Sequence, residues 1–184
     1  MNNFNQEEII KLAAAEGARA GIEKYKSEQN KAVKRKNDKR FKNAKLLLQN
    51  YRDFKSYSDN AKYTAEQAED AIDILDMMWD PNNRSDLVIE SIKASAVRTK
   101  IIMAHIDGML NTYKELCERS TDPIQYRRYA ILFDRYISDK QPTMDEIADK
   151  YNIDKRTAYL DLDTATKRVA KLVFGIDYIT ERNG

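Results

Sequence analysis

Near the carboxyl end of the chain, small and aliphatic residues recur at helical spacing among charged and polar residues. The stripe consists of Ala158, Leu162, Ala165, Val169 and Leu172. Positions three and four apart lie on the same side of an α-helix, so the pattern predicts a helix with one buried face. A shorter apolar set, Ile147, Ala148 and Tyr151, predicts a brief helix just before it.

Polar residues with helix-capping chemistry bound both predicted helices. Thr143 and Glu146 have the spacing of a capping box, in which each side chain accepts a backbone N–H of the first turn. Asn152 suits a left-handed turn position, and Asp154 suits the cap of the next helix. Two caps, a short turn and an in-phase stripe are typical of a helix-turn-helix, whose second helix enters the major groove of DNA. The alternative is an ordinary helical hairpin of an all-α protein.

Helices are also predicted on the amino-terminal side and just before the hairpin. Residues 5–42 contain no proline and are expected to form one long helix. A second helix is expected over residues 44–57, because apolar residues repeat there at helical spacing. Its packing stripe comprises Ala44, Leu47, Leu48, Tyr51 and Phe54. The pair Asp122–Pro123 is typical of a helix start and predicts a helix that packs behind the helix-turn-helix.

The middle of the chain carries further helix signals. Thr64–Gln67 is a second capping box, and Asp80–Asn83 is a turn cluster. Ser85 is expected to cap a long helical segment that runs towards Glu118 and breaks near residues 93–99 or at Gly108.

Composition agrees with helices throughout. The chain has 184 residues with only five Gly and three Pro, and 34% of its residues are charged. Such a mixture favours helices and leaves little room for a turn-rich β architecture. The sequence therefore predicts an all-α protein with three parts: a basic N-terminal helix or arm (residues 1–43), a helical middle segment (44–120) and a C-terminal helix-turn-helix domain (121–184).

Positive charge is concentrated in particular segments. A formal net charge of +2 does not by itself indicate a nucleic-acid partner, but cations cluster in the second half of the first predicted helix. The candidate phosphate contacts there are Lys34, Arg35, Lys36, Lys39 and Arg40. Arg127 and Arg128, after Pro123, are further candidates. Clustered cations release counterions from DNA, which favours a phosphate-contacting arm; the alternative is a solvated or partly disordered arm.

The sequence contains no recognisable catalytic or metal-binding pattern. Cys117 is the only cysteine and His105 the only histidine, so we expect a core cysteine and a hydrogen-bonded, partly buried histidine. Asp70, Asp73 and Asp76 are expected to form a solvated helix face. We therefore predict no enzymatic activity, cofactor, metal or intrachain disulfide. Because no long apolar run or leader pattern is present, we expect a protein that is neither exported nor membrane-spanning.

Several segments resemble, in order, a single family of regulators. The segment Asn43–Lys55 resembles the signature of phage-encoded transcriptional regulators of the ArpU and RinA type. Residues 95–102 and 105–110 resemble the middle of that family, and Arg156–Leu162 followed by Leu172–Asp177 resembles its ending. The resemblance covers most of the chain.

The resemblance implies a C-terminal part similar to region 4 of bacterial sigma factors, in a protein that activates late genes of a bacteriophage or prophage. Carried over by position, the residues at the DNA face are Lys155, Arg156, Thr157, Tyr159 and Leu160. That family often has a basic residue where Leu160 stands, and leucine here suits contact with a thymine methyl group. Asp161 and Asp163 are expected to lower the positive potential of this helix.

The residues and the resemblance together predict a sequence-specific transcriptional activator that binds double-stranded DNA in the bacterial cytoplasm. Arg156 and Tyr159 would select bases, while Lys167, Arg168 and the basic arm would contact phosphates. The middle helices would serve homodimerisation or contact with host RNA polymerase. Two alternatives stay open: a small terminase-like DNA-packaging subunit, and a helical interaction protein that does not bind DNA.

Overall fold

A computed structural model describes residues 5–59, 61, 92 and 95–174, and the regular elements among them are all helices. The predicted all-α class is therefore confirmed. The chain divides into two compact units, Met1–Asp38 and Lys39–Gly184. The described helices of the expected middle segment and of the expected C-terminal domain both belong to the second unit.

The first unit consists of the beginning of α1 (Gln6–Gln49), a helix that continues into the second unit. Every side chain from residue 5 to residue 32 is exposed, so this stretch of the unit buries no face. Such a helix is held by its backbone ladder and by contacts between neighbouring turns. One of these is the hydrogen bond from Gln29 Nε2 to Tyr25 Oη, at 3.0 Å.

Helix α1 passes the expected end near residue 42 and stops at Gln49. At the next residue, Asn50, the side chain donates to the Leu46 carbonyl oxygen (2.8 Å) and the backbone leaves helical geometry (φ −99°, ψ 8°). A new helix, α2 (Tyr51–Ser58), follows. The single helix expected over residues 44–57 is therefore wrong, because the chain there is divided between α1 and α2 by the change of backbone geometry at Asn50. The predicted packing stripe is nevertheless buried in full.

Helix α5 (Ala96–Glu118) begins within the window where a break was expected. Ser95 caps it by accepting the N–H of Arg98. Its buried residues include Cys117, which is a core side chain as expected. His105 is half-buried, with Nε2 3.1 Å from the Val173 carbonyl oxygen, which confirms a hydrogen-bonded histidine.

The helix expected after Asp122 is present as α6 (Pro123–Leu132), followed by a π-helical turn, η1 (Phe133–Ile137). The Asp122 carboxylate caps it by accepting the N–H of Ile124 at 3.0 Å. Arg52 of α2 donates to the carbonyl oxygens of Ser138 (2.7 Å) and Arg135 (3.0 Å). The end of the π-helical turn is thereby tied to α2.

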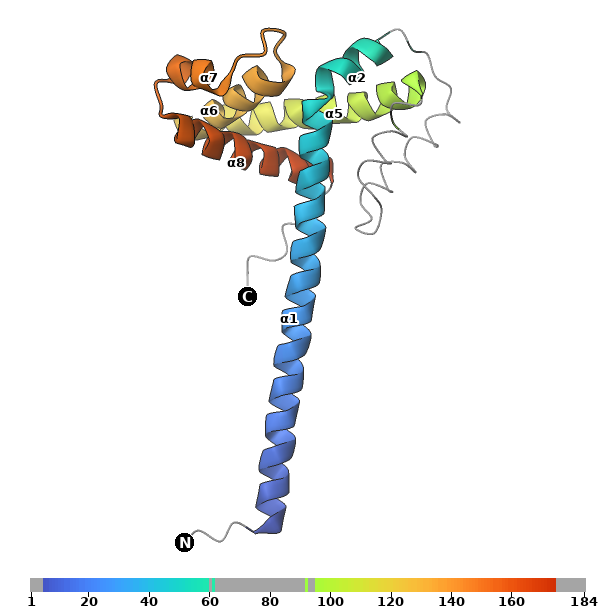
Figure 1. The fold of residues 1–184 in the computed structure, drawn as a ribbon, viewed down its shortest axis with the longest axis vertical. Helices are drawn as coiled ribbons and strands as arrows, with labels where there is room; N and C mark the ends of the chain where they lie inside the picture. Colours follow the sequence, from blue (N-terminus) through green and yellow to red (C-terminus); the bar gives the residue numbers. More distant parts are fainter. Residues whose placement is uncertain (1–4, 60, 62–91, 93–94, 175–184) are drawn as a thin grey trace. The chain divides into compact units, whose positions relative to one another are not determined.

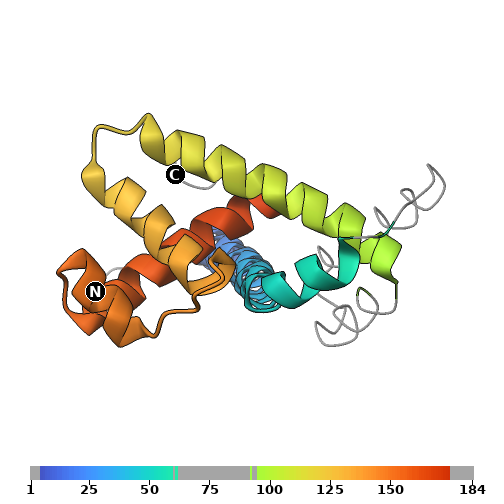
Figure 2. The same cartoon turned by 90° about the horizontal axis from the view of Figure 1, so that it is seen from above.

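The last two helices are α7 (Met144–Tyr151) and α8 (Lys155–Val173). Within the second unit, α2 lies against one end of α5, and α6 and α7 lie towards the other end (Figures 1 and 2). Helix α8 contacts α5, α6 and α7. Its buried face is therefore held from three sides, which leaves the opposite face available.

Several expectations fall outside the described residues. These are the capping box at residues 64–67, the turn at 80–83, the cap at Ser85, and the aspartates at 70, 73 and 76. Helix α8 ends at Val173, and Phe174 is its C-cap residue.

Three tyrosines give the fold a predictable response to alkali. Burial raises the pKa of Tyr51, Tyr113 and Tyr151, and hydrogen bonds to Asp107 and Asp134 add to the rise for Tyr51 and Tyr151. A tyrosine whose pKa is raised in the folded state favours folding while it stays protonated. This contribution is complete below the unfolded-state pKa of about 10 and is lost as the pH rises above that value. We expect the free energy of unfolding, measured by urea denaturation, to fall above about pH 10 as phenolate absorbance rises. Stability that stays constant while phenolate forms would contradict this expectation.

Candidate nucleic-acid interface

The turn between α7 and α8 has the local geometry that the sequence predicts. Thr143 N donates to Glu146 Oε2 (2.7 Å), and Glu146 N donates to Thr143 Oγ1 (3.3 Å), which completes the capping box. The bond from the Thr143 backbone also lowers the pKa of Glu146. Asn152 is left-handed (φ 51°, ψ 51°), and Asp154 accepts the N–H of Thr157 at 2.8 Å. A side chain of the hairpin therefore caps the start of each helix, and the left-handed backbone of Asn152 ends α7.

Helix α8 buries its small aliphatic side and exposes its polar side. Ala158, Leu162, Ala165 and Val169 are buried, as predicted, whereas Leu172 is only half-buried and Val173 is the buried residue at the end of the helix. Arg156 is exposed, and Tyr159 and Leu160 are 51% and 58% exposed. The beginning of α8 thus offers a cation, a phenol and an aliphatic side chain on one accessible edge.

Two of the other expected DNA-face residues are engaged within the hairpin. Lys155 Nζ lies 2.9 Å from Asp145 Oδ2, and this hydrogen bond raises the pKa of Lys155. Both side chains of this ion pair are more than half exposed, so the interaction is weak and Lys155 can readily exchange Asp145 for another partner. Thr157 is half-buried and donates its hydroxyl to Asp154. Its role here is therefore to complete the cap.

The expectation that Asp161 lowers the potential of α8 is corrected by its surroundings. Its side chain is 5% exposed and accepts from Arg127 Nε (2.8 Å) and Arg128 Nε (3.0 Å). Two guanidinium groups more than neutralise one carboxylate. Arg127 and Arg128, expected as phosphate contacts, are thereby engaged in joining α6 to α8.

The middle of α8 is bordered by the end of α1. Lys167 Nζ lies 2.6 Å from Asp163 and 5.5 Å from the centroid of the Phe41 ring. A groove of about 390 Å³ between these helices is lined by residues that include Lys45, Arg135 and Tyr159. Lys45 is exposed and was not among the sequence-based candidates, although it follows Lys42 at the spacing of one helical turn. It extends the cationic edge beside α8.

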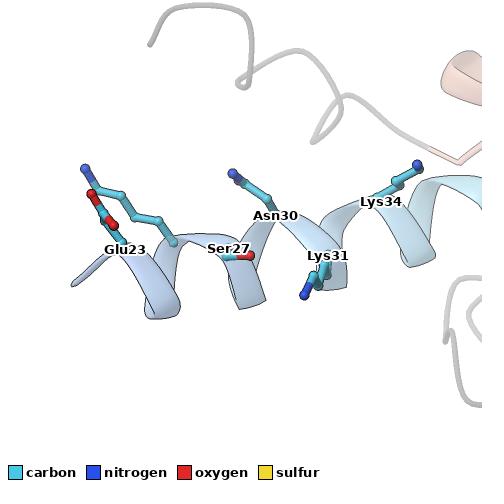
Figure 3. Close-up of a pocket in the computed structure, with 6 residues that line it drawn as sticks. Glu23, Ser27, Asn30, Lys31 and Lys34 are labelled. Atoms are coloured by element: carbon cyan, nitrogen blue, oxygen red, sulfur yellow. The ribbon is translucent and has the colours of Figure 1, made fainter. Parts of the chain in front are cut away.

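The candidate cations of α1 do not share one face. Lys34, Arg35 and Lys36 are consecutive, so their side chains leave the helix about 100° apart. Lys34 lies on the side of α1 that also carries Glu23 and Asn30 (Figure 3), and all the residues lining that shallow pocket come from α1 itself. These cations therefore do not form a single phosphate-binding face on the arm.

Arg40 is the arm residue whose environment differs most from expectation. Its side chain is 8% exposed, so it is buried in the second unit and is not available to a phosphate group in this conformation. Lys39 is half-buried, whereas Lys42 is exposed. The accessible cations at this end of α1 are therefore Lys42 and Lys45.

The described residues hold neither a metal-binding cluster nor a membrane-spanning helix. In the described ranges, no group of three or more His, Cys, Asp or Glu side chains is arranged to hold a metal ion. No described helix combines the length and apolar character needed to cross a bilayer. Comparison with protein-family models, curated proteins and solved structures found no match to this chain.

Proposed function

We propose that this protein is a sequence-specific regulator of transcription that binds double-stranded DNA through α7 and α8. The proposal is supported above all by the exposure of Arg156, Tyr159 and Leu160, which lie on the side of α8 opposite its buried face. They stand in the first turns of a capped second helix, which is where helix-turn-helix proteins carry their base contacts.

The chemistry of these three side chains fits base edges. The major groove is about 12 Å wide and admits one α-helix. A guanidinium such as that of Arg156 donates two parallel hydrogen bonds to a guanine, and an aliphatic group such as Leu160 packs on a thymine methyl. The Tyr159 hydroxyl serves as donor or acceptor to a base edge or a phosphate.

Cations beside this edge would fix the orientation on the duplex without reading sequence. In this proposal Lys155 exchanges its exposed partner Asp145 for a DNA phosphate. Lys45 and Lys167 contact the sugar–phosphate backbone of the duplex from the side of α1. Arg168 and the exposed cations Lys34 and Arg35 add further phosphate contacts in this proposal. Arg156 and Leu160 then discriminate among sequences.

The biological setting in this proposal is a bacterial cell carrying a phage or prophage, where the protein activates late genes. This part is supported by the resemblance of residues 43–55 and 156–162 to the ArpU and RinA type of regulator. Homodimerisation and contact with host RNA polymerase are assigned to the helices before α6. No enzymatic step and no cofactor are included.

The proposal is tested by selecting duplexes from a random library with the full chain and measuring their affinity by fluorescence anisotropy. A consensus is expected to emerge. Between about 50 and 200 mM salt, affinity is expected to fall by a factor on the order of 100 if about four phosphates are contacted. Failure to obtain a consensus, together with a flat salt response, would favour a helical interaction protein that does not bind DNA.

A further inference from the structure

The first part of α1 leaves an apolar face uncovered. Residues 5–32 are all exposed, although small and apolar side chains recur there three, four or seven residues apart, which places them on one side of the helix. This α1 stripe consists of Ile10, Ala14, Ala18, Ile22, Tyr25 and Ala32. Its three large members, Ile10, Ile22 and Tyr25, are each more than half exposed. Large apolar side chains aligned on one face of a helix indicate a surface that another element covers.

The same stretch contains two residues that weaken it as an isolated helix. Gly17 and Gly21 lie beside the α1 stripe, and glycine inside a helix is less stable than alanine. A Cβ added at either position would meet no atom within 4 Å, so packing within the chain does not require glycine there. A partner packed on the stripe would supply stability that this stretch lacks, and the missing side chains would let it approach closely.

The charges of this stretch are distributed unevenly along the helix. Residues 5–16 contain three carboxylates and one cation, whereas residues 24–31 contain three cations and one carboxylate. Those cations, Lys24, Lys26 and Lys31, are exposed, form no ion pair with a residue that the structure describes, and are not among the proposed phosphate contacts. Two parallel copies of the helix would bring like charges together, whereas two antiparallel copies bring each acidic stretch beside a basic one.

We infer that the α1 stripe binds the α1 stripe of a second copy of this chain in antiparallel orientation. Ile10 then lies near Ala32 of the other copy, and Gly21 lies near the midpoint of the contact. The inference rests on the homodimerisation included in the proposed function, and assigns it to one helix face and one orientation. Because the dimer forms without DNA, its absence would leave the DNA-binding proposal standing.

The first test is sedimentation equilibrium of the full chain without DNA. A reversible dimer is expected, with a dissociation constant on the order of 10 μM. The variant Ile22→Gln/Tyr25→Gln replaces two large apolar side chains of the α1 stripe and is expected to weaken the dimer more than tenfold. Both side chains are exposed in the single chain, so urea denaturation should show an unchanged fold of the second unit.

Reversal of charge tests the complementarity of the two copies. Lys26→Glu/Lys31→Glu is expected to weaken the dimer about tenfold, because the new carboxylates lie beside the acidic stretch of the other copy. The matched control is Lys114→Glu/Arg119→Glu, which makes the same change of charge at exposed positions of α5. This control is expected to dimerise as the unmodified chain does.

Cross-linking with a short bis-maleimide reads the orientation, using Ile10→Cys and Ala32→Cys in a chain whose native Cys117 is buried. Antiparallel copies are expected to cross-link only when the two variants are mixed. Parallel copies would cross-link each variant to itself, since the two positions lie about 33 Å apart along one helix at 1.5 Å per residue. The inference is overturned by self-cross-linking, by a chain that stays monomeric, by a dimer that Ile22→Gln/Tyr25→Gln does not weaken, or by a control as weak as the charge-reversed variant.

Discussion

Replacing Arg127 and Arg128 together by alanine is expected to lower the free energy of unfolding by about 3–5 kcal/mol, measured by urea denaturation. The double variant leaves the Asp161 carboxylate buried at 5% exposure without a cation. A buried charge without its partner costs far more than a lost surface ion pair. The same change also loosens α8 from α6.

Two comparison variants separate this effect from the loss of any arginine. Asp161→Ala is expected to cost less, about 1–3 kcal/mol, since the two guanidinium groups it leaves are 28% and 27% exposed and stay partly hydrated. Arg119→Ala, at a largely exposed surface pair, is expected to change stability by less than about 1 kcal/mol. If the double arginine variant is no less stable than Asp161→Ala, the buried Asp161 carboxylate does not need Arg127 and Arg128 to offset the cost of its burial.

Arg156→Ala is expected to lose about 1–3 kcal/mol of discrimination between the selected duplex and a scrambled duplex, while binding to the scrambled duplex changes little. Arg156 is exposed in the first turn of α8, so its removal leaves no buried group unsatisfied and the fold should be unaffected. Anisotropy titrations with both duplexes at one salt concentration measure the difference.

Lys167→Ala is the informative comparison for that variant. A phosphate contact acts on every sequence, so this change is expected to weaken both duplexes alike and to reduce the salt slope by about one. If Arg156→Ala behaves in the same way as Lys167→Ala, Arg156 does not read bases. If neither variant changes binding, α8 does not face the duplex.

The parts of the fold that the sequence predicts well are those set by neighbouring residues. The capping box of Thr143 and Glu146, the left-handed Asn152 and the cap at Asp154 each act within a few positions, so their chemistry can be read from spacing alone. The buried stripe of α8 follows from helical periodicity in the same way.

The features that sequence reasoning missed depend on distant partners or on a local change of backbone geometry. Arg127 and Arg128 meet Asp161 across more than thirty residues of chain, so neither charge pattern nor spacing revealed the cluster. Arg40 resembles its neighbouring cations in sequence, yet tertiary packing buries it. Asn50 ends α1 within a segment whose apolar pattern continues unbroken.

The central claim, that α8 reads bases through Arg156, is tested most directly by a double-mutant cycle. Arg156→Ala is combined, one guanine at a time, with deazaguanine substitutions that remove the N7 acceptor from the selected duplex. We expect a coupling energy of at least about 1 kcal/mol at one guanine, because both changes delete the same hydrogen bond, the one from Arg156 to the guanine N7. Additive effects at every guanine would contradict it.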